Sequence, residues 1–201
     1  MTLSVLTFAV TWAGCLTLAI AGAFSLGDRQ QPIGEFDIGA LYAALDERRS
    51  ARGISWQQVT REINARFDGM PLRPVSASTL RTLREHAGVE GDGVLQMLLW
   101  LNRTPESFVR PVPQLRGNAA LPDVGSGKIL RFDTRSLHAA LDAQRVDRGM
   151  TWQQVADQIG GISPASLTRL AKGGRTTFPQ VMRMTGWLAR PAAEFTRASD
   201  R

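Results

Sequence analysis

Apolar and polar residues follow one another along this chain with the spacing of short amphipathic helices. Trp152, Val155 and Ile159 recur at intervals of about one turn, which places them on a single helix face. Gly160 and Gly161 come next, and they end the helix because glycine adopts left-handed backbone conformations without a Cβ clash. Similar patterns fill most of the chain beyond its first 35 residues. We therefore predict an all-α fold.

Two stretches of the chain are copies of one module. Residues 36–63 align without gaps with residues 132–159, and 15 of the 28 aligned positions are identical. The first copy then contains nine extra residues, after which the alignment resumes. Internal similarity of this extent indicates a tandem repeat. We predict one domain over residues 36–110 and a second over residues 132–201.

Each copy is predicted to contain five helices, most of which begin at a good capping residue. The side-chain oxygen of Asp, Ser or Thr accepts a hydrogen bond from a free backbone N–H in the first turn. The expected caps are Asp37, Ser55, Ser76 and Asp92 in the first copy and Asp133, Thr151, Ser163 and Thr177 in the second. The expected helices cover residues 38–52, 56–65, 77–86, 93–102 and 105–110, and then 134–148, 152–159, 164–172, 178–188 and 191–198.

The stretch from Thr151 to Gly173 predicts two short helices joined by a tight turn. Pro164 suits the first position of the second helix, where its missing N–H is harmless. Leu167 and Leu170 lie on one face of that helix and are expected to point inward. The residues expected to face outward are Ala165, Ser166, Thr168, Arg169 and Lys172.

Residues 155–195, VADQIGGISPASLTRLAKGGRTTFPQVMRMTGWLARPAAEF, resemble the phage-repressor type (Cro-like, Xre) helix-turn-helix domain. The family pattern runs apolar-Ala-x-x-apolar-Gly, a small polar opening to the recognition helix, apolar-x-Arg-apolar-x-x-Gly and two closing helices. The chain departs from it in a turn that is one residue longer and in Ala171, where the family often has glutamate. The resemblance implies two tandem five-helix domains of the lambda-repressor type, with double-stranded DNA as partner.

The same resemblance implies which residues meet DNA. Base-edge contacts are expected from the start and outer face of the recognition helix, and phosphate contacts from residues around it. In the second copy the residues placed for DNA binding are Gln153, Ser163, Ala165, Ser166, Thr168, Arg169, Lys172 and Arg175, of which Gln153, Lys172 and Arg175 suit phosphates. In the first copy they are Gln57, Ser78, Thr79, Arg81 and Thr82.

Charge separates the two copies. The whole chain has a formal net charge of +6. Residues 36–110 contain ten Arg or Lys against nine Asp or Glu, whereas residues 128–201 contain twelve against six. Because phosphate neutralisation supplies most nonspecific affinity for DNA, the second copy is the stronger DNA-binding candidate. The leading hypothesis is a sequence-specific DNA-binding regulator of transcription that uses tandem helix-turn-helix domains. The alternative is a membrane-tethered helical scaffold whose modules bind protein partners rather than DNA. A protein partner is a separate expectation for the first domain.

The N-terminal segment, residues 1–27, is apolar and leaves three interpretations open. No charged residue occurs between Thr2 and Gly27. A helix of this length, roughly 35–40 Å, would cross a hydrocarbon core of ~30 Å. A signal peptide and a misassigned start are the other two interpretations. With an anchor, the arginines that follow would keep the rest of the chain in the cytoplasm, tethered to the inner face of the membrane.

The sequence also contains two linkers and few residues that are candidates for metal binding or catalysis. Residues 28–35 are a short polar linker, and residues 111–131 are rich in Pro, Gly and small residues, so the copies are free to stay apart or pack together. The lone Cys15 and the isolated His86 and His138 have no partners at metal-ligand spacing. We expect no enzyme activity, cofactor or metal. The repeated tryptophans at 56, 100, 152 and 187 are expected in the core.

Overall fold

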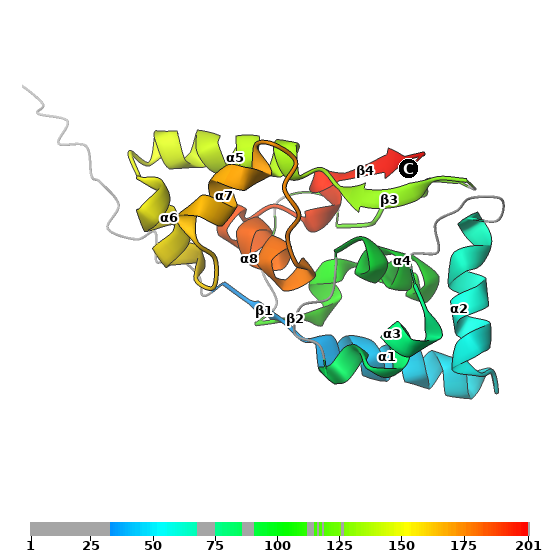
Figure 1. Cartoon of the computed structure of the whole chain (residues 1–201). Coiled ribbons are helices and arrows are strands. Elements are labelled where there is room, and N and C mark those ends of the chain that lie inside the picture. The colour runs from blue at the N-terminus through cyan, green and yellow to red at the C-terminus, as the bar shows by residue number, and fades with distance from the viewer. Residues whose placement is uncertain are drawn as a thin grey trace, which may run out of the picture. The chain divides into compact units, whose positions relative to one another are not determined.

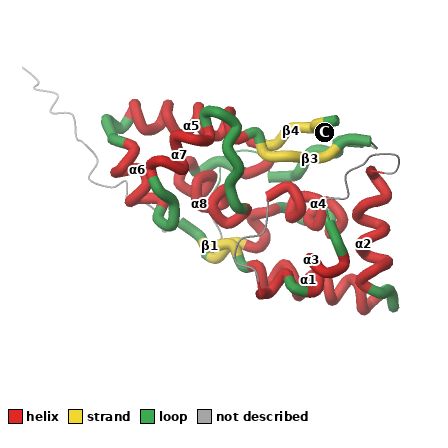
Figure 2. Tube along the Cα trace, viewed as in Figure 1, coloured by secondary structure: helices red, strands yellow, loops and turns green. Residues whose placement is uncertain are grey.

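Helices make up most of the described chain, with short strands at the ends of each copy (Figures 1 and 2). The structure is a computed structural model and describes residues 33–67, 75–85, 91–111, 115, 117, 119–125 and 127–200. The apolar segment 1–27, most of the linker before residue 36, residues 68–74 in the region of the insertion, and His86 lie outside the described residues, and the predictions made for them stay predictions. None of the helices within these described ranges is long and apolar enough to span a membrane.

The two copies contain the same α-helices and strands in the same order, and the described part of the first copy has two additional 3₁₀ turns. The first copy consists of β1 (Glu35–Phe36), α1 (Ile38–Ala51), α2 (Trp56–Asn64), a 3₁₀ turn (Ala65–Phe67), α3 (Ala77–Arg81), a 3₁₀ turn (Leu83–Glu85), α4 (Gly91–Leu101), a 3₁₀ turn (Pro105–Phe108) and β2 (Val109–Arg110). The second consists of β3 (Ile129–Phe132), α5 (Thr134–Asp147), α6 (Trp152–Ile159), α7 (Pro164–Leu170), α8 (Phe178–Leu188), a 3₁₀ turn (Ala192–Phe195) and β4 (Thr196–Ser199). The prediction of a mainly helical fold is confirmed, with small two-stranded sheets added to it.

Side-chain caps start α1, α2, α3, α5, α6 and α7 at the residues that the sequence predicted, and α8 follows the predicted Thr177, whose N–H donates to the Gln180 side chain at 3.4 Å. The Asp37 carboxylate accepts from the Ala40 N–H at 2.8 Å, and the Asp133 carboxylate caps α5 in the same way. Serine or threonine hydroxyls cap α2, α3, α6 and α7. The prediction for Asp92 is wrong, because α4 begins at Gly91 and therefore includes Asp92 in its first turn.

The fifth α-helix predicted in each copy is wrong. A single 3₁₀ turn occupies its first part, and the chain then extends into β2 or β4. β1 pairs antiparallel with β2, and β3 pairs antiparallel with β4 (Figure 1). Each strand finds its partner at the opposite end of its copy, which no local pattern reveals. β3 also occupies the last three residues of the predicted 111–131 linker.

In each copy, an arginine in the last turn of the first helix contacts the start of the second helix. Arg145 pairs with Asp142 at 2.7 Å, donates to the Met150 carbonyl oxygen at 2.8 Å, and lies 5.1 Å from the centre of the Trp152 ring. Arg49 repeats these contacts in the first copy with Asp46, Ile54 and Trp56. The guanidinium suits this role because it is planar and has several donors in fixed directions.

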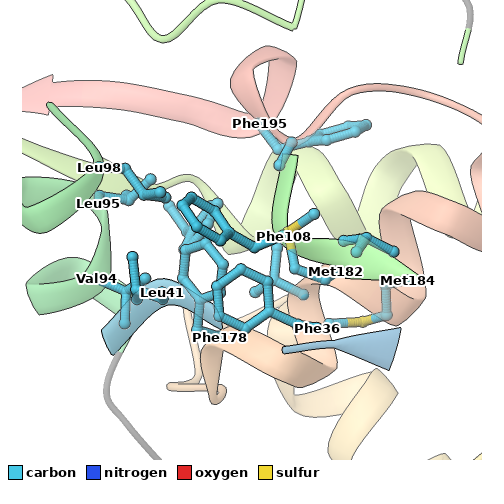
Figure 3. Close-up of a cluster of buried hydrophobic side chains, with 14 of the residues drawn as sticks. Phe36, Leu41, Val94, Leu95, Leu98, Phe108, Phe178, Met182, Met184 and Phe195 are labelled. Carbon is cyan, nitrogen blue, oxygen red and sulfur yellow. The ribbon is translucent and has the colours of Figure 1, made fainter. Parts of the chain in front are cut away.

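The two copies share one hydrophobic core. Residues Pro32–Arg201 form a single compact unit. α4 of the first copy contacts β3 of the second, α8 of the second contacts β1 of the first, and α4 and α8 contact each other. Phe36 and Phe178 meet with ring centres 4.6 Å apart, within a cluster that takes side chains from both copies (Figure 3). Of the two arrangements that the linker left open, the structure has the packed one.

The repeated tryptophans lie in or against this core, as predicted. Trp187 is buried, and Trp56, Trp100 and Trp152 are half-buried against the cluster. The indole N–H of Trp187 donates to Gln158 at 2.8 Å, and that of Trp100 donates to Glu62 at 3.0 Å. A half-buried indole with its N–H satisfied is a structural residue.

Candidate nucleic-acid interface

The turn between α6 and α7 is built on two glycines. Gly160 and Gly161 have φ of 69° and 67°, which is the left-handed region where a Cβ would be strained. A Cβ on Gly161 would also lie 3.2 Å from the Arg183 guanidinium. The Ser163 hydroxyl then accepts from the Ser166 N–H at 3.2 Å and starts α7. The double glycine noted in the sequence thus forms a tight turn that sets α7 against α6.

α7 has one buried and one exposed face. Leu167 and Leu170 are buried, with relative exposures of 0% and 1%. Ala165, Thr168 and Arg169 are exposed. The outward set predicted from the sequence therefore does face solvent, apart from Ser166, which is half-buried.

Hydrogen bonds along α7 hold its polar side chains close to the helix. The Arg169 Nη2 donates to the Ser166 hydroxyl at 2.8 Å, and that hydroxyl lies 3.0 Å from the Ser163 hydroxyl. The Thr168 hydroxyl donates to the Ala165 carbonyl oxygen at 3.1 Å. A guanidinium has five N–H donors, so this contact orients Arg169 and leaves donors for a ligand.

Three cationic side chains, Arg135, Lys172 and Arg175, surround the loop that follows α7; we call them the α7 cation cluster. Lys172 and Arg175 are exposed and flank Gly173, whose φ is 78°. Arg135 comes from the first turn of α5, and its Nε would lie 3.6 Å from a Cβ on Gly173. Sequence reasoning missed Arg135, because only the tertiary fold brings the start of α5 to this loop.

Gln153 sits on the exposed face of α6. Its side-chain amide Nε2 donates to the Asp157 carboxylate at 2.9 Å. The Nε2 amino group has two N–H donors, and this contact uses one of them. Gln153 is a weaker phosphate ligand than the α7 cation cluster, because its amide is neutral and lies against the Asp157 carboxylate.

The corresponding helix of the first copy has a different surface. Gln57, Ser78, Thr79 and Arg81 are exposed, but Thr82 is half-buried and donates to the Ser78 carbonyl oxygen at 3.0 Å. The hydroxyls of Ser78 and Thr79 lie within 2.8 and 2.7 Å of the Ser76 hydroxyl. α3 also ends at Arg81 and continues as a 3₁₀ turn, so it is shorter than α7 and than the predicted helix 77–86.

The cations near α7 are not repeated at the equivalent positions of the first copy, where Arg81 and Arg84 instead stand in place of Thr168 and Ala171. Positions in the first copy correspond to those 96 residues later before the insertion and 87 residues later after it. By this correspondence Gly39 stands in place of Arg135, Thr82 in place of Arg169 and Glu85 in place of Lys172. Charge that favours a polyanion is thus concentrated at the second copy.

Comparison with known proteins finds no relative for this chain: no family model matches it, and neither does any curated protein or solved structure.

Proposed function

We propose that this chain is a sequence-specific DNA-binding protein that regulates transcription, with α7 as its recognition helix. The observation that carries the proposal is the exposed polar face of α7, with Arg169 oriented on it and the α7 cation cluster beside it. A capped helix that follows a tight turn is the arrangement that helix-turn-helix proteins insert into the major groove. The resemblance of residues 155–195 to the Cro-like domain supports the same conclusion.

Two kinds of contact are assigned to different residues. Ser163, Ala165, Ser166 and Arg169 lie at the start and on the outer face of α7, where they reach base edges. An arginine there pairs with O6 and N7 of guanine through two N–H donors. The α7 cation cluster binds the flanking phosphates, which give affinity without sequence preference.

The first copy takes the place of a second subunit in this proposal. Helix-turn-helix proteins commonly act as dimers, and here the two copies are joined in one chain and share a core. Because Thr82 and Glu85 replace cationic residues, α3 contributes less affinity for DNA than α7. The nearly neutral net charge of the first copy favours a protein partner for it as the second candidate function.

The proposal is tested by titrating the full-length chain onto a fluorescent random-sequence duplex at several salt concentrations. The logarithm of the association constant should fall linearly with the logarithm of salt concentration. Lys172→Ala and Arg175→Ala should each flatten that slope by about one phosphate's contribution. Arg61→Ala is the matched control, because Arg61 is an exposed arginine on α2 of the first copy.

Two results would contradict DNA binding by the second copy. One is the absence of salt-dependent association at the lowest salt concentration. The other is an equal change of slope for Arg61→Ala and Lys172→Ala, since this would assign the charge effect to the whole molecule rather than to α7.

A further inference from the structure

The contact between the two copies is reciprocal. α4 of the first copy lies on β3 of the second, and α8, the counterpart of α4, lies on β1, the counterpart of β3. The 3₁₀ turns Pro105–Phe108 and Ala192–Phe195 also contact each other. Such an exchange of equivalent surfaces is typical of a twofold dimer, in which a module pairs with an identical module. The residues at equivalent positions of this interface nevertheless differ in ways that fit only unlike copies.

The first difference is in size, at the first residue of α4 and α8. Phe178 is fully buried, with its ring centre 4.6 Å from that of Phe36 in the other copy and 5.5 Å from that of Phe132 in its own. The equivalent residue of α4 is Gly91, and a Cβ there would lie 2.8 Å from the Phe132 ring. Figure 3 shows Phe178 and Phe36 together in the shared cluster. One copy therefore supplies a large side chain and the other supplies none.

Pairing of either copy with a second copy of itself would lose this fit. If the second copy paired with itself, Phe178 would occupy the place of Gly91, where even a methyl group meets the Phe132 ring. If the first copy paired with itself, Gly91 would occupy the place of Phe178 and leave Phe36 without its ring partner. Overpacking and cavities are both unfavourable in a close-packed core.

The second difference is in charge. Arg183 on α8 pairs with Glu35 on β1 at 2.9 Å, and Arg131 on β3 lies 3.6 Å from Asp92 on α4. Because Arg131 is the counterpart of Glu35, pairing of the second copy with itself would bring Arg183 against Arg131. Pairing of the first copy with itself would bring Asp92 against Glu35. Both self-pairings thus replace attraction by repulsion between like charges.

The third difference is in a buried hydrogen bond. The Glu106 carboxylate is buried in the 3₁₀ turn of the first copy and accepts from the Ala192 N–H of the second at 2.7 Å. The counterpart of Ala192 is Pro105, which has no N–H, and the counterpart of Glu106 is Ala193, which has no acceptor in its side chain. Either self-pairing would leave a buried polar group without its partner, which is costly.

We propose that this interface selects unlike copies, so that the first module pairs only with the second and neither pairs with itself. Size is the main determinant together with the Glu106 hydrogen bond, because both are buried. The ion pairs are partly exposed and add less, since exposed pairs contribute little to stability. The selection holds within one chain and between chains, because each of the three features needs one residue from each copy.

The intact chain allows a direct test, because Gly91 and Phe178 both occupy the first helical position. Gly91→Phe and Phe178→Gly should each lower the urea midpoint of unfolding. The double variant moves the large side chain to the opposite copy and should lose less stability than the two single losses added together, because the ring at position 91 can fill space that Phe178 leaves beside Phe132. Glu35→Arg, Arg183→Glu and their double variant form the matched charge cycle. The double variant should recover less of the lost urea midpoint than in the size cycle, and this recovery should weaken at high salt. Additive losses in the size cycle, with no recovery in the double variant, would overturn the proposal.

Partner choice is measured separately on a chain that folds intact and is then cut. A protease site inserted between Pro122 and Asp123, which are exposed, allows cleavage after folding. The cut protein is unfolded in urea and refolded by dilution. Native mass spectrometry then measures the masses of the complexes, which show which parts each complex contains. Complexes with one N-terminal and one C-terminal part are expected. A complex with two N-terminal or two C-terminal parts would contradict the proposal, and if the parts fail to refold, the intact-chain cycle decides by itself.

Discussion

At the residue scale, Arg169 is the side chain on which DNA sequence preference should depend most. It is exposed on α7 and is oriented by its 2.8 Å contact with the Ser166 hydroxyl. Arg169→Ala should cost ~1–3 kcal/mol at one base position and relax specificity there, because a bidentate contact to guanine is lost. Selection of bound duplexes from a random pool, with wild type and variant, measures this.

Lys128→Ala is the charge-matched control for Arg169→Ala. Lys128 is exposed just before β3 and is not on the recognition helix, so its removal should leave the selected sequences unchanged. Identical preferences in the wild type and in Arg169→Ala would show that Arg169 reads no base, and α7 would then only position the protein on DNA.

Glu106 should make stability depend on pH. Burial raises the pKa of the Glu106 carboxyl, although the hydrogen bond from the Ala192 N–H opposes that shift. A raised pKa in the folded state means that the group favours folding below its unfolded pKa of about 4.3 and that this contribution is lost as pH rises through the folded value. Glu106→Gln should therefore be more stable than the wild type at neutral pH.

The stability difference between Glu106→Gln and wild type should shrink as pH falls, and it should level off below the unfolded pKa of about 4.3. Urea unfolding across this range measures it. Glu106→Ala is the companion variant: it removes the acceptor for the Ala192 N–H and should cost ~1–3 kcal/mol, because a buried donor is left unsatisfied. If the difference in unfolding free energy between wild type and Glu106→Gln is the same at every pH, then Glu106 does not carry a buried charge at neutral pH.

At the element scale, substitutions at the caps of α3 and α7 distinguish an effect on stability from an effect on DNA binding. Ser76 and Ser163 cap equivalent helices in the two copies, each by accepting from the N–H three residues on. Replacing either by alanine should lower stability by ~1 kcal/mol. Only Ser163→Ala should also weaken DNA binding, since α7 carries Arg169 and lies beside the α7 cation cluster. Equal losses of affinity in the two variants would indicate that both helices contact DNA.

The caps and turns of these elements were predictable, and their ends and strands were not. Thr151 with Gln154, and Gly160 with Gly161, are local signals that the structure confirms. The 3₁₀ turns and strands that close each copy depend on a partner strand about 70 residues away along the chain. Phe132, for example, pairs with Thr196, and all of α5 to α8 lies between these two residues in the chain.

At the scale of the whole molecule, the shared core should make the two copies unfold together. Phe36→Ala in the first copy removes the ring that Phe178 packs against and should cost ~3–5 kcal/mol. With 5-fluorotryptophan labelling, the fluorine signals of Trp56 and Trp187, one from each copy, should lose native intensity at the same lowered urea concentration. A shift confined to Trp56 would mean that the copies unfold independently.

The sequence by itself determined the repeat, the helical character, most caps and the outward face of α7, because these depend on residues within a few turns of one another. It also showed which copy has the excess of positive charge. Only the tertiary structure decided that Arg135 joins Lys172 and Arg175 beside α7, and that the two copies pack on one core through Gly91, Phe178 and Glu106. Those contacts join residues far apart in the chain, and a linker of this length is compatible with copies that never meet. Packing between the copies is settled by the fit of buried side chains, which local spacing does not contain.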